Sequence, residues 1–440
     1  MKCILLMIPG LVIATPSARC DDPTPAPIEK LIEQLGSRSF AEREKATKAL
    51  RERGPAALPA VRKALESKDE EVRKRAESLV PVLEIEEALL PKRVTLKVDG
   101  QPISTVLSDV AKQTGFKLSP LGKEDGKKVT ADFKDVPFWE AMENVLRQSG
   151  RGFGFQQREG ELYTTAWSAK SPFVNFRGPF RLEANWFHED RDIDLTAAPK
   201  GEGGRRSNLT LSVSVLTEPR LTFLNVHPAK VQEAVDSEGK SLLEPGVAAD
   251  RPDVSSPRIV PPPTPDVVGS YPTGRGTFRG ESTSFSDVRL RRASESAKSL
   301  KLVRGTIPVK TILIRRNVVV TNKVLESAGT KFRAGADGLE ITQVQNQGGG
   351  SLSVEIAVPQ HDGNRNTQWY ERFHVEDDAG NKFQSHGSGS RSDGMHWWIS
   401  IYCGPPFNKK NVGPPTKLVF EDWVIHDHEI PFEFKDVPLP

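Results

Sequence analysis

Two stretches of the chain repeat one order of apolar and polar positions. Apolar residues alternate with polar ones over 94–98, and the same alternation returns 35 residues later over 129–133. Alternation of this kind predicts strands with one buried face each. Apolar residues then follow at helical spacing over 103–110 and again over 138–145, which predicts two amphipathic helices. The repeated unit is therefore a strand followed by a helix.

The residues at the ends of the two predicted helices agree with this unit. Pro102 and Pro137 stand at the helix starts, where the missing amide proton has no intrahelical partner to lose. Gly115 and Gly150 stand at the helix ends, where a residue that tolerates positive φ is favoured. The stretch after Gly150 alternates around "REG" and predicts a hairpin that completes a small sheet. We expect one βα domain over 92–168.

This domain resembles the short N-terminal domain of secretins and TonB-dependent receptors. The second predicted strand, the segment "VPFWEAMENVLRQSG" and the hairpin carry the resemblance. It implies a periplasmic module that mediates contacts between proteins. The rest of the chain has no series of amphipathic strands that would build a barrel or pore, so a transport role is not expected.

Trp139 is a candidate partner-binding residue in this domain. It follows Phe138 in the first turn of the second helix, about 100° around the axis, where the first copy has Ser104. A large aromatic side chain at the edge of an apolar stripe either fills a groove against the helical region before it or stays available to a partner. The sequence leaves both interpretations open.

The region 28–90 shows helical spacing of apolar residues in several short segments. "SFAEREKATKAL" and "KDEEVRKRAESLV" place Arg43 and Ala46 in the same positions as Arg73 and Ala76, and "GPAALP" separates the two segments. The 30-residue period, the break and the arginine positions resemble HEAT-type helical repeats. The resemblance implies a protein-binding scaffold.

From residue 171 onward the chain is rich in predicted strands and contains a second duplication. The strand at 209–215 has a counterpart at 352–358, and the turn "VDSEGKSL" matches "EDDAGNKF"; aspartate and glycine suit tight turns. We expect two immunoglobulin-like β-sandwiches, 171–325 and 326–440. Eight prolines fall within 244–284, which predicts an extended insertion in the first sandwich. The expected fold class is multi-domain α+β.

The first 20 residues have the layout of a secretory signal peptide, with Lys2 before an apolar run and then small or polar residues. Removal of this segment would leave Cys403 as the one remaining cysteine, and so no internal disulfide. No window reaches the about 18 apolar residues of a spanning helix, so we expect no integral membrane segment after signal removal and a periplasmic or secreted location. A lipid anchor on Cys20 is the less favoured alternative, because Arg19 stands where such signals have a small residue.

Charge and motifs exclude several classes of function. The formal net charge is +3, which gives no electrostatic bias toward nucleic acid. The sequence contains no G-x-S-x-G, H-E-x-x-H, phosphate-binding loop or C-x-x-C pair. We therefore predict a protein that is not an enzyme, with no catalytic, cofactor-binding or metal-binding residues.

Two weak metal-like patterns do not change this prediction. "DRDIDL" places Asp190, Asp192 and Asp194 as in a calcium loop, but Leu195 stands where that loop needs glycine. His426 and His428 lie two apart on a predicted strand and so share a face. The sequence identifies no third ligand, and His374 and His396 qualify only if the fold brings their strands together. Hydrogen-bonded surface histidines are the favoured interpretation.

The segment "MHWWISIYC" supplies two further candidate partner-binding residues. Side chains alternate between the two faces of a strand, so Trp397 lies on the same face as Ile399 and Ile401. Trp398 lies on the opposite face together with Tyr402. An exposed Trp398 and Tyr402 pair suits stacking on a sugar or anchoring a protein. The alternative is that another domain covers them.

Three functions remain open. The favoured one is a non-catalytic exported adaptor or scaffold that binds an envelope or secreted protein. The second is a carbohydrate or cell-surface binding protein that uses the β-sandwiches. The third is a hydrolase with an unrecognised site, which would need a deep pocket with paired acids or histidines.

Overall fold

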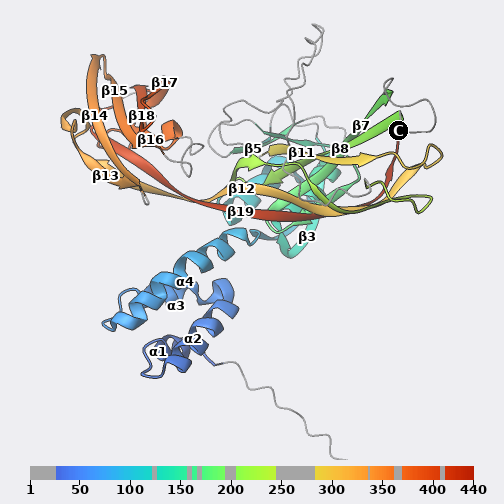
Figure 1. Cartoon of the computed structure of the whole chain (residues 1–440), viewed down its shortest axis with the longest axis horizontal. Coiled ribbons are helices and arrows are strands. Elements are labelled where there is room, and N and C mark those ends of the chain that lie inside the picture. The colour runs from blue at the N-terminus through green and yellow to red at the C-terminus, as the bar shows by residue number, and fades with distance from the viewer. Residues whose placement is uncertain are drawn as a thin grey trace, which may run out of the picture. The chain divides into compact units, whose positions relative to one another are not determined.

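The computed structural model describes nine stretches of the chain, namely residues 26–120, 126–155, 161–165, 171–193, 205–243, 283–334, 337–360, 369–406 and 412–440. The predicted signal peptide and nearly all of the proline-rich insertion 244–284 lie outside these residues. The chain divides into two compact units, Met1–Glu87 and Ala88–Pro440, and its fold is mixed α+β (Figure 1). No helix among the described residues is long and apolar enough to cross a membrane.

The first unit is helical, and its elements are α1 (Ile28–Gln34), α2 (Phe40–Glu52), η1 (Gly54–Ala57), α3 (Leu58–Ala64) and α4 (Glu70–Leu89), drawn in blue in Figure 1. Its core is built from one stripe of each helix, with Leu50, Leu58 and Leu79 fully buried. Ser39 caps α2, because its side chain accepts the N–H of Glu42 at 3.5 Å.

Arg43 and Arg73 make the same contact 30 residues apart. Arg43 Nη1 donates to the carbonyl oxygen of Ser37 at 2.8 Å, and Arg73 Nη1 donates to that of Ser67 at 2.7 Å. Each arginine thus binds the turn that precedes its own helix. The period seen in the sequence therefore corresponds to a repeated contact in the structure.

The second unit begins with the βα module, whose elements are β1 (Arg93–Pro102), α5 (Ile103–Thr114), β2 (Lys117–Pro120), β3 (Lys128–Pro137), α6 (Phe138–Ser149), β4 (Gly152–Phe155) and β5 (Glu161–Thr165). β1 pairs antiparallel with β3, while β2, β5 and β4 form a second sheet in that order. The predicted hairpin, β4 with β5, therefore does not extend the β1–β3 sheet. It pairs instead with β2, a short strand directly after α5 that the sequence pattern did not reveal.

Glutamines from the two helices of the module bind the two strands in the same way. Gln113 of α5 accepts the N–H of Thr95 at 2.9 Å and donates to its carbonyl oxygen at 2.8 Å. Gln148 of α6 does the same to Thr130, at 3.0 and 2.9 Å. Both helices end at a glycine with positive φ, 74° and 65°. The duplication at 35 residues is therefore confirmed down to single side-chain contacts.

The remainder of the second unit is built from strands, namely β6 (Val174–Arg177), β7 (Phe180–Ile193), β8 (Arg205–Thr217), β9 (Thr222–Val226), β10 (Lys230–Asp236), β11 (Thr283–Arg291), β12 (Ser299–Thr321), β13 (Lys331–Ala334), β14 (Asp337–Gly348), β15 (Ser351–Pro359), β16 (Phe373–Glu376), β17 (Gln384–Ser392), β18 (His396–Gly404) and β19 (Lys417–Pro438), with the short helices η3 (Val324–Glu326) and η4 (Trp369–Glu371). Two outer sheets have the strand orders β11-β8-β7-β6 and β13-β14-β15-β18-β17. A third sheet joins β10, β12, β19 and β16, and β9 also pairs with β12.

The long strands β12 and β19 run through both predicted sandwiches, as Figure 1 shows (yellow and red). Their antiparallel register extends from Ser299 opposite Pro438 to Thr321 opposite Leu418. The late part of β12 belongs to the second core, where Val320 packs. The expected division into separate sandwiches at 325/326 is therefore wrong, because one sheet continues across it. Each of the two strands is more than 20 residues long, and no turn interrupts either of them.

The second duplication is confirmed at its turns. Asp236 Oδ1 accepts the N–H groups of the second and fourth residues after it, at 2.9 and 2.8 Å. Asp377 Oδ1 accepts the equivalent groups at 3.0 and 2.8 Å. Gly239 and Gly380 supply the positive φ of each turn, 82° and 77°. The two halves of the β-rich region thus contain the same kind of turn. They are also joined by one sheet.

Candidate functional site

Trp139 is buried rather than exposed. Only 1% of it is exposed, its ring centroid lies 5.0 Å from that of Phe138, and its Nε1 donates to the carbonyl oxygen of Pro179 at 3.0 Å. Pro179 belongs to the turn between β6 and β7. The groove that Trp139 fills thus includes the turn between β6 and β7, in the β-rich region. The prediction that Trp139 is a partner-binding residue is therefore wrong, because the side chain fills a groove inside the second unit.

An ion pair beside Trp139 joins the same two regions. Arg181 of β7 donates from Nε to Glu143 of α6 at 3.0 Å and from Nη1 to Glu183 at 2.6 Å, and Arg181 is 2% exposed. Leu216 of β8 belongs to the hydrophobic core of the βα module. This face of α6 is therefore an internal contact of the second unit.

Trp398 and Tyr402 lie on one face of β18, as their parity predicts. Tyr402 is 42% exposed, whereas Ile399 and Ile401 on the opposite face are buried. Trp398 is half-buried, because the guanidinium carbon of Arg391 lies 4.2 Å from its ring centroid. Among the described residues, Trp398 is covered by this side chain and not by a separate domain.

Residues from four neighbouring strands surround this aromatic pair and together form what we call the polar face: Glu340, Gln343 and Gln345 of β14, Ser353, Glu355 and Ala357 of β15, Trp398, Ser400 and Tyr402 of β18, and Gly387, Gly389 and Arg391 of β17. Direct cross-strand pairing places them on the same side of the sheet. The other side of β15 and β18 is buried in the second core.

Glu355 is the carboxylate in the central rows of the polar face and is held in place by its neighbours. Arg391 Nη2 donates to Glu355 Oε1 at 3.2 Å, and Thr342 Oγ1 donates to the same oxygen at 2.8 Å. Burial alone would raise the pKa of Glu355, but the hydrogen bonds and the charge of Arg391 bring it below the ordinary value. Glu355 is therefore ionised and paired at neutral pH.

His426 and His428 lie side by side on β19, with ring centroids 5.8 Å apart. Both ring nitrogens of His428 are buried without a hydrogen-bond partner among the described residues. Burial, and then the nearby His426, lower the pKa of His428 to about 4. His428 is therefore not the hydrogen-bonded surface histidine that the sequence suggested. His374, by contrast, is hydrogen-bonded to Glu376 at 3.0 Å.

The described residues contain no group of three or more histidines, cysteines or acids that could hold a metal ion. His396 is exposed and lies beside Asp393, with Nδ1 at 3.9 Å from a carboxylate oxygen. The four histidines named from the sequence are thus not gathered into one site. Asp194 and Leu195 lie outside the described residues.

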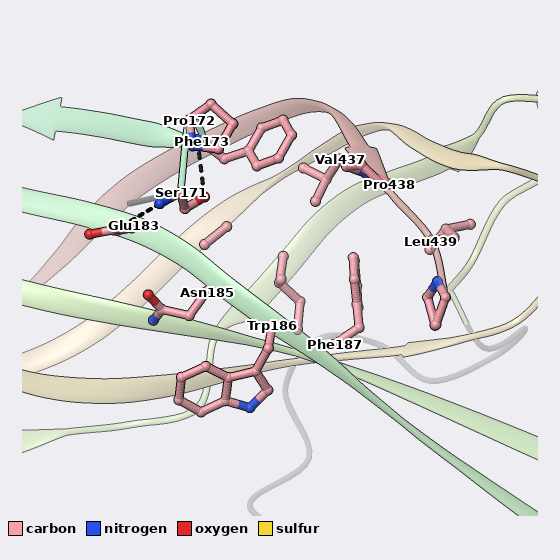
Figure 2. Close-up of a pocket in the computed structure, with 13 residues that line it drawn as sticks. Ser171, Pro172, Phe173, Glu183, Asn185, Trp186, Phe187, Val437, Pro438 and Leu439 are labelled. Atoms are coloured by element: carbon pink, nitrogen blue, oxygen red, sulfur yellow. Dashed lines mark hydrogen bonds between the residues drawn. The ribbon is translucent and has the colours of Figure 1, made fainter. Parts of the chain in front are cut away.

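A cavity of about 720 Å³ lies between β7 and the end of β19 (Figure 2). Its lining is Ser171, Pro172, Phe173, Glu183, Ala184, Asn185, Trp186, Phe187, Leu211, Val437, Pro438, Leu439 and Pro440. Asn185 Nδ2 is buried and has no hydrogen-bond partner among the described residues. Glu183 is the single carboxylate of the lining and accepts the N–H of Ser171 at 2.9 Å. The lining therefore lacks the paired acids or histidines that a hydrolase needs.

Sequence reasoning missed Arg391, Gly387 and Gly389 as members of the polar face. A signal was present in "HGSGSRS", where two glycines and an arginine stand at alternate positions. Its meaning depends on β17 pairing with β18 in one particular register, which the sequence pattern does not provide.

No family model matches the chain. The chain is 29% identical over 129 residues to the DNA utilization protein HofQ of Escherichia coli (strain K12), a match that covers 29% of this chain and 30% of HofQ. The chain thus spans less than a third of that relative. The similarity is consistent with a domain like the N-terminal domain of secretins. A solved structure, described as the conserved domain protein from Bacillus anthracis, aligns over 60% of this chain and 91% of its own with 10% identity and a TM-score of 0.15, which is too low to show a shared fold.

Proposed function

We propose that the protein is a non-catalytic adaptor of the cell envelope, periplasmic or secreted, that binds other envelope proteins. The observation that carries this proposal is the duplicated βα module, with Gln113 and Gln148 in equivalent contacts. A module of this pattern resembles the short N-terminal domain of secretins, and the similarity to HofQ supports the same context.

The helical unit is the second support. The equivalent contacts of Arg43 and Arg73 favour the HEAT-type interpretation, and helical repeats present extended surfaces to partners. Phe40, in the first turn of α2, is 66% exposed, with the guanidinium carbon of Arg43 at 5.6 Å from its ring centroid. A large exposed aromatic next to a fixed arginine has the composition of an interface anchor. We propose that Phe40 contacts the partner.

The surfaces named above also support a non-catalytic role. The side chains that line the cavity beside β7 include one carboxylate, that of Glu183, which accepts a hydrogen bond from the backbone N–H of Ser171. Glu355 and Arg391 neutralise one another on the polar face. None of these groups is arranged as a nucleophile with a base, or as an acid with a base.

Cross-linking in the native cell, followed by quantitative mass spectrometry of the full chain and its cross-linked partners, tests the proposal. The full chain should enrich at least one envelope protein over an unrelated exported protein. Phe40→Ala should lower that enrichment about fivefold, since loss of an interface anchor costs roughly 1 kcal/mol or more.

Leu325→Ala is the matched control, because Leu325 is another exposed apolar side chain, 42% exposed, in the second unit. It should leave the enrichment unchanged. Enrichment of no envelope protein by the wild-type chain would contradict the adaptor function. Equal loss in both variants would contradict only the role of Phe40.

A further inference from the structure

We propose that the polar face of β14, β15, β18 and β17 is a binding site for a neutral polysaccharide chain, with Trp398 and Tyr402 as the stacking surfaces. This activity goes beyond the adaptor function, because its ligand is a glycan and not a protein.

The residues of the polar face have the hydrogen-bonding groups that sugar hydroxyls require. Two rows run straight across the four strands, Gln343, Glu355, Ser400 and Gly389 in one and Gln345, Ser353, Tyr402 and Gly387 in the other. Amides, hydroxyls and a carboxylate supply donors and acceptors side by side. Neither row contains a branched aliphatic side chain, so the face lacks the apolar centre expected of a protein interface.

The charges of the face favour a neutral ligand. Glu355 is the one charged residue of the two rows, and it forms an ion pair at 3.2 Å with Arg391 of the adjacent row. Glu340, in the same row as Arg391, forms a second ion pair with Lys331 of β13 at 3.6 Å. An anionic glycan would need an unpaired basic group, and nucleic acid would need several. Because each carboxylate of the face is paired with a basic side chain, a ligand is selected by its hydroxyl groups.

The spacing of the aromatic side chains favours an extended ligand. Trp398 and Tyr402 stand four residues apart on β18, which places them about 13 Å apart along the strand. Ser400 lies between them on the same face. A single sugar reaches one of the two rings, whereas an oligosaccharide reaches both. The aromatic rings offer flat apolar surfaces, and Tyr402 adds a hydroxyl group.

The two glycines of β17 keep the space above the face open. A Cβ atom added to Gly387 or to Gly389 would meet nothing within 4 Å, and neither residue has a positive φ. The backbone therefore does not require glycine at these positions. Glycine inside a strand costs stability, and it often marks a place where a ligand approaches the backbone closely. We infer that the ligand lies over Gly389 and Gly387, beside Ser400 and Tyr402.

Isothermal titration of the full chain with defined oligosaccharides tests this proposal. The probes are the hexasaccharides of cellulose, xylan and starch, all neutral, with the hexamer of galacturonic acid as the anionic comparison. The wild-type chain should bind at least one neutral hexasaccharide and bind the anionic one at least tenfold more weakly.

Three variants test the assignment of the site. Trp398→Ala, Tyr402→Ala and Gly389→Val should each weaken binding about tenfold or more, since valine suits a strand but fills the open space. Tyr402→Phe should stay within about threefold of wild type, because it keeps the ring. Thermal unfolding of each variant shows whether the fold is retained.

Trp186→Ala is the control, because Trp186 is an exposed aromatic side chain, 48% exposed, on another sheet. It should leave binding unchanged. The proposal is overturned if no neutral hexasaccharide binds, if the galacturonic acid hexamer binds best, or if Gly389→Val binds as well as wild type. The cross-linking experiment on Phe40 is unaffected by any of these results, so the two proposals fail separately.

Discussion

The second unit contains two faces with a tryptophan that the sequence singles out, one on α6 and one on β18. Trp139 on α6 is covered by the turn at Pro179 and by β7 and β8. On β18, Trp398 is half-buried by side chains of its own sheet, Arg391 and His396, and Tyr402 on the same face remains 42% exposed. Both faces border an ion pair that includes an arginine.

The two faces differ in the side chains that the neighbouring strands place next to them. Arg181 of β7 pairs with Glu143 of α6. Leu216 of β8 packs in the hydrophobic core of the βα module. β17 presents Gly389 and Gly387 to Ser400 and Tyr402, so it covers neither of these two residues with a side chain. An aromatic side chain at the edge of its own element is thus covered or left open by residues far away in the sequence.

Trp139→Ala should have the largest effect on stability. Replacing a fully buried tryptophan leaves a cavity and typically costs about 3–5 kcal/mol. Urea unfolding monitored by circular dichroism measures the loss in free energy of unfolding. Tyr402→Ala, on the open face, is the comparison. Equal losses in both variants would mean that Trp139 is not covered in solution.

Glu143→Ala should destabilise the second unit by about 3 kcal/mol, because it removes the carboxylate that contacts two nitrogens of the buried Arg181 guanidinium. The double variant Glu143→Leu with Arg181→Met should recover part of this loss, since apolar side chains of similar size often replace a buried ion pair without penalty, although Glu183 then loses its contact with Arg181. Urea unfolding of the wild type and both variants measures the effect. A single variant as stable as wild type would show that the contact between α6 and β7 is not closed in solution.

The half-buried His428 predicts that the stability of the protein depends on pH. The pKa of His428 is lowered from 6.5 to about 4 in the folded protein, so the unfolded chain binds the proton more readily. Its contribution to stability is complete above the ordinary pKa and is lost as pH falls from 6.5 toward 4. Since the ring is partly exposed, we expect a loss of about 1–2 kcal/mol.

Thermal unfolding between pH 7 and 4 measures this contribution as the difference between wild type and His428→Phe, which should be less sensitive to acid. Trp186→Ala, a change at an exposed side chain that does not titrate, should keep the dependence of the wild type. Identical pH profiles for wild type and His428→Phe would rule out the buried, unpartnered state of His428.

Tyr402→Ala should have the smallest effect on stability, within about 0.5 kcal/mol of wild type, because substitutions of exposed side chains rarely cost more. The same urea unfolding measures it. A loss above about 2 kcal/mol would indicate that another part of the protein packs on the polar face.

The sequence predicted those features whose causes are local. The repeat at 35 residues, the helix ends at Gly115 and Gly150, and the turns at Asp236 and Asp377 all follow from residues close together in the chain, and the structure confirms them.

The features that the sequence did not predict depend on distant partners. Glu143 meets Arg181 from 38 residues away, and the Trp139 ring nitrogen meets Pro179 from 40 residues away. The shared sheet of β12 and β19 was hidden because alternation shows that a strand exists and does not show which strand it pairs with. To predict the polar face, one would have to know how the residues of four strands pair with one another.

Hydroxyl-radical footprinting of the full chain tests most directly whether the α6 face is covered while the β18 face is open. Side chains exposed to water are oxidised, and mass spectrometry locates each product. Tyr402 should be oxidised at least tenfold faster than Trp139, although free tryptophan reacts as readily as tyrosine. Oxidation of Trp139 at a rate equal to that of Tyr402 would contradict the covered α6 face and return Trp139 to the residues that a partner can reach.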